Sequence, residues 1–135
     1  MKYTFKQRIN FYDCDPAGIM FYGNVYRLCH SAYEKMIEES IPDEEYWNNS
    51  LYIVPIIKSE ASYHKPFLAG ETAVVELQVT VLKSSSFELS YTCLNTKGEV
   101  CVKVKTVHVF VNKKSSEKIV MPGSISSALK NFTVY

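Results

Sequence analysis

The chain has 135 residues, of which 47% are hydrophobic, and a formal net charge of +1 at pH 7. This length predicts a single domain over residues 1–135, and the apolar fraction suits a packed core rather than a disordered chain. So small a charge does not favour a nucleic-acid partner, and no apolar run approaches the roughly 20 residues of a membrane span. The first ten residues lack the apolar centre of a signal peptide, so we expect a cytoplasmic protein.

The N-terminal third of the chain predicts one strand and then one long helix. Residues 3–11, YTFKQRINF, alternate between apolar and polar side chains, which is typical of a half-buried strand. Asp-Pro and Ala-Gly pairs then interrupt the pattern. From Asn24, which can serve as an N-cap, apolar residues recur at i, i+3, i+4 and i+7 through Ile37. This spacing predicts an amphipathic helix of about four turns that ends before Pro42, and residues 43–49 are expected to add a short helical turn.

The rest of the chain reads mostly as strands. Residues 52–67 are extended, and Pro55 indicates a sheet edge or a bulge. Residues 99–112 predict a long final strand, and the tail after Pro122 is either a short helix or frayed. Between them lie two alternating segments, whose inward positions are Ala73, Val75, Leu77, Val79 and Val81 in the first and Phe87, Leu89, Tyr91 and Cys93 in the second.

This order of elements predicts an α+β fold in two layers. The long helix is expected to pack on the concave side of a five-stranded antiparallel sheet. One helix covers only one face of such a sheet, and the segment VCVKVKTVHVFV places apolar residues on both faces. We therefore expect a homodimer, or a homotetramer built as a dimer of dimers.

The segment FYDCDPAGIMFYGNVYR, residues 11–27, places two acids beside many aromatic side chains. A carboxylate is costly to desolvate unless a partner holds it or a reaction uses it. Together with the length and the order of elements, this segment resembles the hotdog-fold thioesterases. The closer match is the 4-hydroxybenzoyl-CoA thioesterase (4HBT) family, which includes the YbgC-type acyl-CoA thioesterases. The resemblance covers nearly the whole chain, and residues 61–71, ASYHKPFLAGE, carry a weaker part of it.

The resemblance implies an enzyme that hydrolyses a small acyl-CoA or aromatic acyl-CoA thioester to the free acid and CoA. It implies no metal and no cofactor, because CoA is part of the substrate. Asp15 would be the catalytic nucleophile or general base, and the turn at Tyr22 and Gly23 would be the oxyanion site. The physics agrees, because unpaired N–H groups at a helix N-terminus favour developing negative charge. The motif alone leaves open that both acids merely cap turns, and we expect Asp13 to do so while it helps to hold Asp15.

Further candidates for substrate binding follow from the resemblance. His30 stands where the family often carries an acid that orients the substrate, and we expect it either to line the acyl pocket or to lie at an interface. The alternative to substrate binding is an ordinary structural role: a loop or interface residue for His64, and solvated surface residues for Lys58 and the turn around Lys83. The candidates for contacts with the substrate and its CoA moiety are His30, Lys58, His64, Lys83, Ser85 and Ser86.

Other kinds of chemistry have weaker signals. Cys14 lacks a neighbouring His that would make it a nucleophile, and His108 reads as a packed histidine within a strand. Neither the cysteines nor the histidines have the spacing of metal ligands. A hotdog dehydratase would need a catalytic His motif that is not present, whereas a non-catalytic acyl-CoA-binding module is the alternative from another class. The acyl group remains open among aliphatic, benzoyl, phenylacetyl and naphthoyl thioesters.

Overall fold

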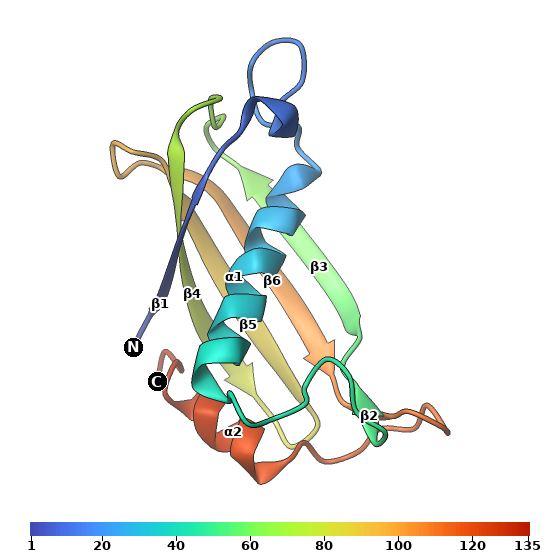
Figure 1. Ribbon diagram of the computed structural model, residues 1–135. Coiled ribbons are helices and arrows are strands. Elements are labelled where there is room, and N and C mark those ends of the chain that lie inside the picture. The colour runs from blue at the N-terminus through green and yellow to red at the C-terminus, as the bar shows by residue number, and fades with distance from the viewer.

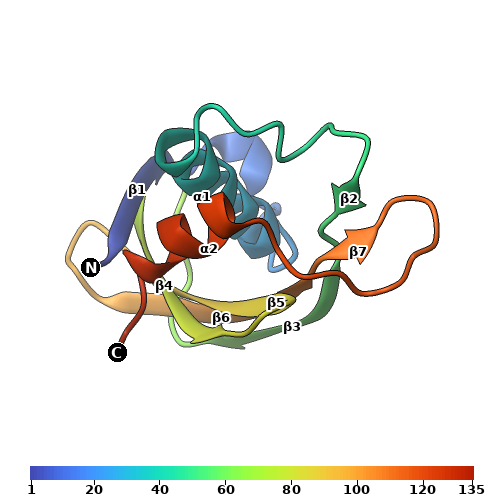
Figure 2. The same cartoon turned by 90° about the horizontal axis from the view of Figure 1, so that it is seen from below.

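A curved antiparallel sheet carries two helices on one of its faces (Figures 1 and 2). The computed structural model describes residues 1–135. The sheet has the strand order β1-β4-β5-β6-β3, and the expected α+β fold with a five-stranded antiparallel sheet is confirmed. The elements in chain order are β1 (Tyr3–Arg8), the 3-10 helix η1 (Phe11–Asp13), α1 (Asn24–Ser40), β2 (Tyr52–Ile53), β3 (Ile56–Tyr63), β4 (Thr72–Leu82), β5 (Ser86–Leu94), β6 (Val100–Val109), β7 (Val111–Asn112) and α2 (Gly123–Lys130).

Helix α1 lies across the concave face of the sheet, as expected (Figure 2). Its apolar stripe is buried, from Val25 through Ile37. The prediction that Asn24 is the N-cap was wrong, because the cap is Gly23 and Asn24 is the first helical residue. The Asn24 side chain instead donates from Nδ2 to the carbonyl oxygen of Asp13 at 2.8 Å. Asn24 therefore ties the start of the helix to the loop before it.

Strands β4 and β5 bury the predicted face, with one exception. The inward residues from Ala73 to Val79 on β4 and from Phe87 to Cys93 on β5 are all buried. Val81 was predicted to point inward as well, but it is 36% exposed. The pairing of β4 with β5 shifts in register between Val79 and Val81, and an extra residue at such a bulge reverses the faces of the positions that follow. Leu82 packs against the core instead.

The outer face of β6 carries both charged and apolar side chains. Lys103 and Lys105 are exposed there, and Val107 and the buried Val109 alternate with them on the same face, so the segment has apolar side chains on both faces, as expected. The segment does not form one strand, however, because β6 ends at Val109 and β7 pairs with β2 in a separate two-stranded sheet. The buried Phe110 lies between them and donates its N–H to the carbonyl oxygen of Ser85 at 2.8 Å.

The C-terminal tail and the segment after α1 complete the inner layer. The tail forms α2, which buries Ile125 and Leu129 beside β4. The predicted helical turn over residues 43–49 was wrong. Asn49 accepts the N–H groups of Leu51 and Tyr52 through its side-chain oxygen, at 2.9 and 2.8 Å. These bonds stabilise an open loop in place of a helix, as Asn side chains commonly do.

Strand β3 is one edge of the sheet, and its only neighbour in the sheet is β6 (Figure 1). Its register against β6 shifts between Ile56 and Lys58, next to Pro55, so the expected edge strand with an irregularity at this proline is confirmed. All residues of β3 are exposed except the half-buried Ala61. Two cavities lie along this edge, one that Tyr63 lines and one that Ile56 and Ser59 line.

Candidate active site

Asp15 lies in the loop between η1 and α1, at one end of the sheet. Its backbone N–H donates to the carbonyl oxygen of Ile19, and its own carbonyl accepts the N–H of Gly18, both at 2.9 Å. Its side-chain Oδ1 accepts the N–H of Ala17 at 2.9 Å. Gly18 has φ of 79°, which a side chain would disfavour, so this glycine allows the tight turn. One carboxylate oxygen thus shapes the turn, while Oδ2 has no hydrogen bond within the chain.

Asp13 has a different environment from Asp15. Its side-chain Oδ2 accepts the N–H of Asn10 at 2.8 Å, and its carbonyl oxygen accepts the N–H of Phe21 at 3.0 Å and the side-chain amide of Asn24. These bonds connect β1, the loop and the start of α1. Asp13 caps the loop, as expected, and it holds the segment on which Asp15 sits.

The turn into α1 presents two backbone amides with no acceptor. The N–H groups of Tyr22 and Gly23 make no hydrogen bond within the chain, whereas Asn24 donates to the carbonyl oxygen of Phe21 at 2.9 Å. A Cβ on Gly23 would come within 3.1 Å of the Phe21 ring, so the glycine lets this aromatic side chain lie against the backbone. Free amides at the positive end of a helix are suited to an oxygen that becomes negatively charged.

A groove of about 350 Å³ opens beside these amides. Tyr22 lies on one side of it, and Tyr63, His64 and Phe67 lie on the other. The Tyr63 hydroxyl donates to the carbonyl oxygen of Tyr22 at 2.9 Å, which ties the end of β3 to the turn before α1. The groove also includes Ile19, whose carbonyl holds the Asp15 N–H. The structure therefore brings Tyr22 and His64 together close to the Asp15 loop.

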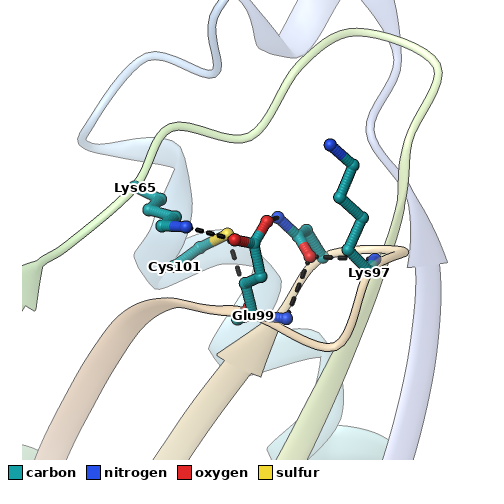
Figure 3. A network of polar contacts seen from close by, with 5 residues as sticks. Lys65, Lys97, Glu99 and Cys101 are labelled. Carbon is teal, nitrogen blue, oxygen red and sulfur yellow. Dashed lines mark hydrogen bonds and ion pairs between the residues drawn. The ribbon is translucent and has the colours of Figure 1, made fainter.

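A polar network supports the His64 side of the groove, and no pattern in the sequence pointed to it. Figure 3 shows the Lys65 ammonium facing the Glu99 carboxylate, which also accepts the side-chain amide of Asn95 at 3.0 Å. The hydrogen bonds from Lys65 and Asn95 lower the pKa of Glu99. The N–H groups of His64 and Lys65 both donate to the carbonyl oxygen of Cys101, at 2.7 and 3.1 Å. The wall of the groove is thereby fixed to the β5–β6 turn.

His30 lies two helical turns into α1 and lines a second cavity. Its ring packs near Tyr33 and Trp47, with centroid separations of 5.4 and 5.9 Å. Its Nδ1 lies 3.5 Å from a carboxylate oxygen of Glu34, and the side chain is half-exposed. The cavity measures about 240 Å³ and is separate from the groove at the helix start.

The candidates for CoA binding lie far from Asp15 within one chain. Lys83 and Ser85 lie in the β4–β5 turn and Ser86 is the first residue of β5, at the opposite end of the sheet from the Asp15 loop (Figure 1). Strand β4 spans the ten steps between these ends, or roughly 33 Å at 3.3 Å per residue. Lys58 lies on the exposed edge strand near its first residues. One chain alone therefore does not bring these residues to the Asp15 loop.

The remaining chemistry-bearing side chains are held by their surroundings. Partial burial and the charges of Asp13 and Asp15 raise the pKa of the Cys14 thiol, which lies 3.5 Å from the carbonyl oxygen of Asn10. His108 is fully buried and stacks on Phe87, so its expected packed role is confirmed. No three His, Cys, Asp or Glu side chains form a metal-binding group. None of the helices has the length and apolar character needed to cross a membrane.

This architecture, a long helix laid on a five-stranded antiparallel sheet, is the hotdog fold of acyl-CoA thioesterases. A 1,4-dihydroxy-2-naphthoyl-CoA thioesterase from Synechocystis superposes with a TM-score of 0.90 at 18% identity over 97% of each chain. A gentisyl-coenzyme A thioesterase has a TM-score of 0.81 at 25% identity, over 95% of this chain and 99% of the other. A 1,4-dihydroxy-2-naphthoyl-CoA hydrolase from Nostoc punctiforme is 30% identical over 93% of this chain and 84% of its own length.

Residues 9–129 match the thioesterase-like superfamily, and the chain belongs to this family. The expected enzyme class is confirmed: the protein is a hydrolase of CoA thioesters. This outcome also decides against the non-catalytic binding module that the sequence left open.

Proposed function

We propose that the protein hydrolyses an aromatic acyl-CoA thioester to the free acid and CoA, with Asp15 as the catalytic carboxylate. The observation that carries this assignment is the free Oδ2 of Asp15 in the loop that leads to the unpaired amides of Tyr22 and Gly23. The aromatic substrate class is supported by the related 1,4-dihydroxy-2-naphthoyl-CoA hydrolase and by the aromatic side chains of the groove. The acyl group would be of the size of a hydroxylated naphthoyl or benzoyl group.

In the proposed reaction, the thioester carbonyl oxygen lies at the start of α1. The N–H groups of Tyr22 and Gly23 then donate to this oxygen as it becomes an anion, and the helix dipole adds to the stabilisation. Asp15 attacks the carbonyl carbon or activates a water molecule that does so, and the CoA thiolate leaves. Backbone amides, the Asp15 side chain and water supply every group in this scheme, so the proposed reaction needs no metal and no cofactor.

The CoA moiety is proposed to lie between two copies of the chain. The β4–β5 turn with Lys83 and Ser85, together with the adjoining Ser86, lies at the wrong end of the sheet to assist Asp15 of the same chain. If two copies of β3 pair in antiparallel fashion, their ends exchange, and this turn of one copy comes to the end of the sheet where the other copy has Asp15. Lys58 on β3 would then lie along the same boundary. Lys58 and Lys83 would offset the charge of the CoA phosphates at the surface of the protein, where salt weakens the attraction between the ammonium and phosphate groups.

Substitution of the two acids tests the assignment. Asp15→Asn preserves the side-chain oxygen that accepts the Ala17 N–H, but an amide is a poor nucleophile and a poor base. We expect kcat to fall by at least about 100-fold at an unchanged melting temperature. Asp13→Asn is the matched control, because its amide oxygen still accepts the Asn10 N–H, and it should lose less than about tenfold. Release of free thiol from a panel of acyl-CoA substrates measures both. A folded Asp15→Asn protein with the wild-type kcat would refute the assignment.

A further inference from the structure

The cavity between α1 and β3 has a polar inner wall that the proposed reaction does not use. It measures about 240 Å³, and Tyr26 and His30 line it from the helix side. These residues follow Tyr22 by one and two helical turns, or roughly 6 and 12 Å along the axis at 1.5 Å per residue. An aromatic ring whose thioester lies at the start of α1 would extend over this distance. The cavity therefore lies within reach of the acyl group in the proposed function.

Three buried side chains form a hydrogen-bonded relay on the sheet side of this cavity. The Tyr91 hydroxyl lies 3.0 Å from the Thr106 hydroxyl, which lies 2.7 Å from Nε2 of His108. Tyr91 and Thr106 both line the cavity, whereas His108 lies behind them. Their exposed fractions are 1%, 5% and 0%, so the relay is shielded from solvent. Buried polar groups of this kind are retained only when they find partners, because an unpaired one is costly.

The protonation of His108 determines which group donates each hydrogen bond in the relay. Burial lowers the pKa of His108 to about 3, so the ring is neutral and carries one N–H. Nδ1 is buried without a hydrogen-bond partner. An orphaned N–H is rarer in proteins than an orphaned acceptor, so the proton belongs on Nε2, which donates it to the Thr106 hydroxyl. Thr106 in turn donates to Tyr91. The Tyr91 proton is then left without an acceptor inside the protein.

We propose, on the basis of the proposed function, that this cavity binds the aromatic ring of the acyl group and that the Tyr91 hydroxyl donates a hydrogen bond to a ring oxygen remote from the thioester. The ligand class is thus an aryl thioester with a hydroxyl or keto substituent on the far side of the ring. A ring without this oxygen leaves the hydroxyl proton of the buried Tyr91 without a hydrogen-bond acceptor. Sites that are built to bind an oxygen reject analogues that lack it for this reason.

A pair of substrates that differ by one oxygen on the far side of the ring system tests the proposal: 6-hydroxy-2-naphthoyl-CoA and 2-naphthoyl-CoA. We expect the wild type to prefer the hydroxylated substrate by roughly 10- to 100-fold in kcat/KM. Tyr91→Phe should reduce this preference to less than threefold, mainly through loss of kcat/KM for the hydroxylated substrate. Thr106→Ser retains the relay and should retain the preference. Tyr46→Phe is the matched control, because it removes another buried hydroxyl, one that pairs with Tyr33 and does not line the cavity.

Binding of the free acids gives a readout that does not depend on turnover. The wild type should bind 6-hydroxy-2-naphthoate more tightly than 2-naphthoate in calorimetry, and Tyr91→Phe should bind the two alike. Equal kcat/KM values of the wild type for the two thioesters would overturn the subsite while leaving the proposed function in place. A Tyr91→Phe protein that keeps the preference would overturn it as well. A wild type that hydrolyses only aliphatic thioesters would instead refute the aromatic substrate class, and the subsite with it.

Discussion

The two carboxylate oxygens of Asp15 have different surroundings. Oδ1 accepts the Ala17 N–H, and Oδ2 has no hydrogen bond within the chain, so Oδ2 is the oxygen with no competing partner for the proposed attack on a thioester or for accepting a proton from water. A fixed Oδ1 also fixes the plane of the carboxylate. A carboxylate held in this way loses little freedom when it attacks, which favours nucleophilic catalysis over the recruitment of a water molecule.

Isotope labelling distinguishes the two routes. We predict that single-turnover hydrolysis in oxygen-18 water gives an unlabelled first product and places the label in Asp15. Attack by Asp15 forms a mixed anhydride, and the new oxygen of the product comes from the carboxylate when water opens the anhydride at the aspartyl carbonyl. Mass spectrometry of the product and of the peptide that contains Asp15 measures both. Prompt label in the first product, with none in the protein, would contradict nucleophilic attack and support the general-base route.

His108 makes the stability of the fold depend on pH. Its pKa is about 3 in the folded protein because burial disfavours the charged ring, whereas an unfolded His has a pKa of about 6.5. Below pH 6.5 the unfolded chain therefore binds a proton that the folded chain does not. Stability from this residue is present above that pH and is lost as the pH falls from 6.5 toward 3.

We predict that this loss amounts to about 2 kcal/mol between pH 7 and pH 5. Urea denaturation at the two pH values measures the free energy of unfolding. His108→Gln removes the titrating group and retains a polar side chain, so its unfolding free energy should fall less over the same interval, even if the variant is less stable throughout. Parallel pH profiles of the wild type and of His108→Gln would show that His108 does not titrate on unfolding.

At the scale of elements, the loop between η1 and α1 is held in shape by Gly18 as much as by hydrogen bonds. Its φ of 79° lies in the left-handed region, and a Cβ there would meet no atom within 4 Å. We predict that Gly18→Ala lowers the free energy of unfolding by about 1–2 kcal/mol through backbone strain alone. Because the same turn carries Asp15, kcat should fall with it.

Gly123→Ala is the control for this prediction. A Cβ on Gly123 also meets nothing within 4 Å, but Gly123 lies in the first turn of α2 and has no positive φ. It should therefore leave stability unchanged or raise it slightly, because Ala is the better helix former. Thermal unfolding and thiol release compare the two variants. Equal effects of both substitutions would mean that strain at Gly18 is not what shapes the loop.

Elements with a local periodicity were predictable from the sequence, and the residues proposed for catalysis could be assigned to one place in the fold. Asp15, Tyr22 and Gly23 lie on one short segment, where the motif, a turn and a helix start can all be read together. Features that join distant segments were not predictable. The pair of Lys65 and Glu99 spans 34 residues of sequence, and it exists only because the β3–β4 loop meets the β5–β6 turn.

The register between strands limits prediction in the same way. Tyr91, Thr106 and His108 each fit an ordinary strand pattern, but their relay depends on how β5 pairs with β6, where Tyr91 lies opposite Val104. A one-residue shift would turn these side chains to the other face. The exposed Val81 makes the same point, since a bulge in β4 reversed a face that strict alternation had predicted to be buried.

At the scale of the whole molecule, the sheet has an open edge at β3. This strand is eight residues long, and it exposes Ile56, Ile57 and Tyr63 along with its unpaired backbone groups. An edge of this kind is a template for pairing with another strand unless charges or prolines protect it. The outer face of the sheet carries the exposed Lys103 and Lys105, so the edge favours a partner more than this face does. A second copy of the chain at β3 would cover the apolar side chains and close the cavities beside α1.

We predict that the wild type is a dimer or a dimer of dimers, and that a charge at the β3 edge disrupts it. Ile57 is 64% exposed in the single chain, so Ile57→Lys should leave the fold intact while it places a desolvated ammonium in the paired edge. Light scattering should show a smaller mass, and kcat/KM should fall although Asp15 is untouched, because the proposed CoA site needs residues of both copies. Val120→Lys adds the same charge at an exposed position outside the sheet and should change neither. A wild type that is monomeric at micromolar concentration and fully active would show that one chain suffices, and Lys58, Lys83, Ser85 and Ser86 would then have no route to the substrate held by Asp15.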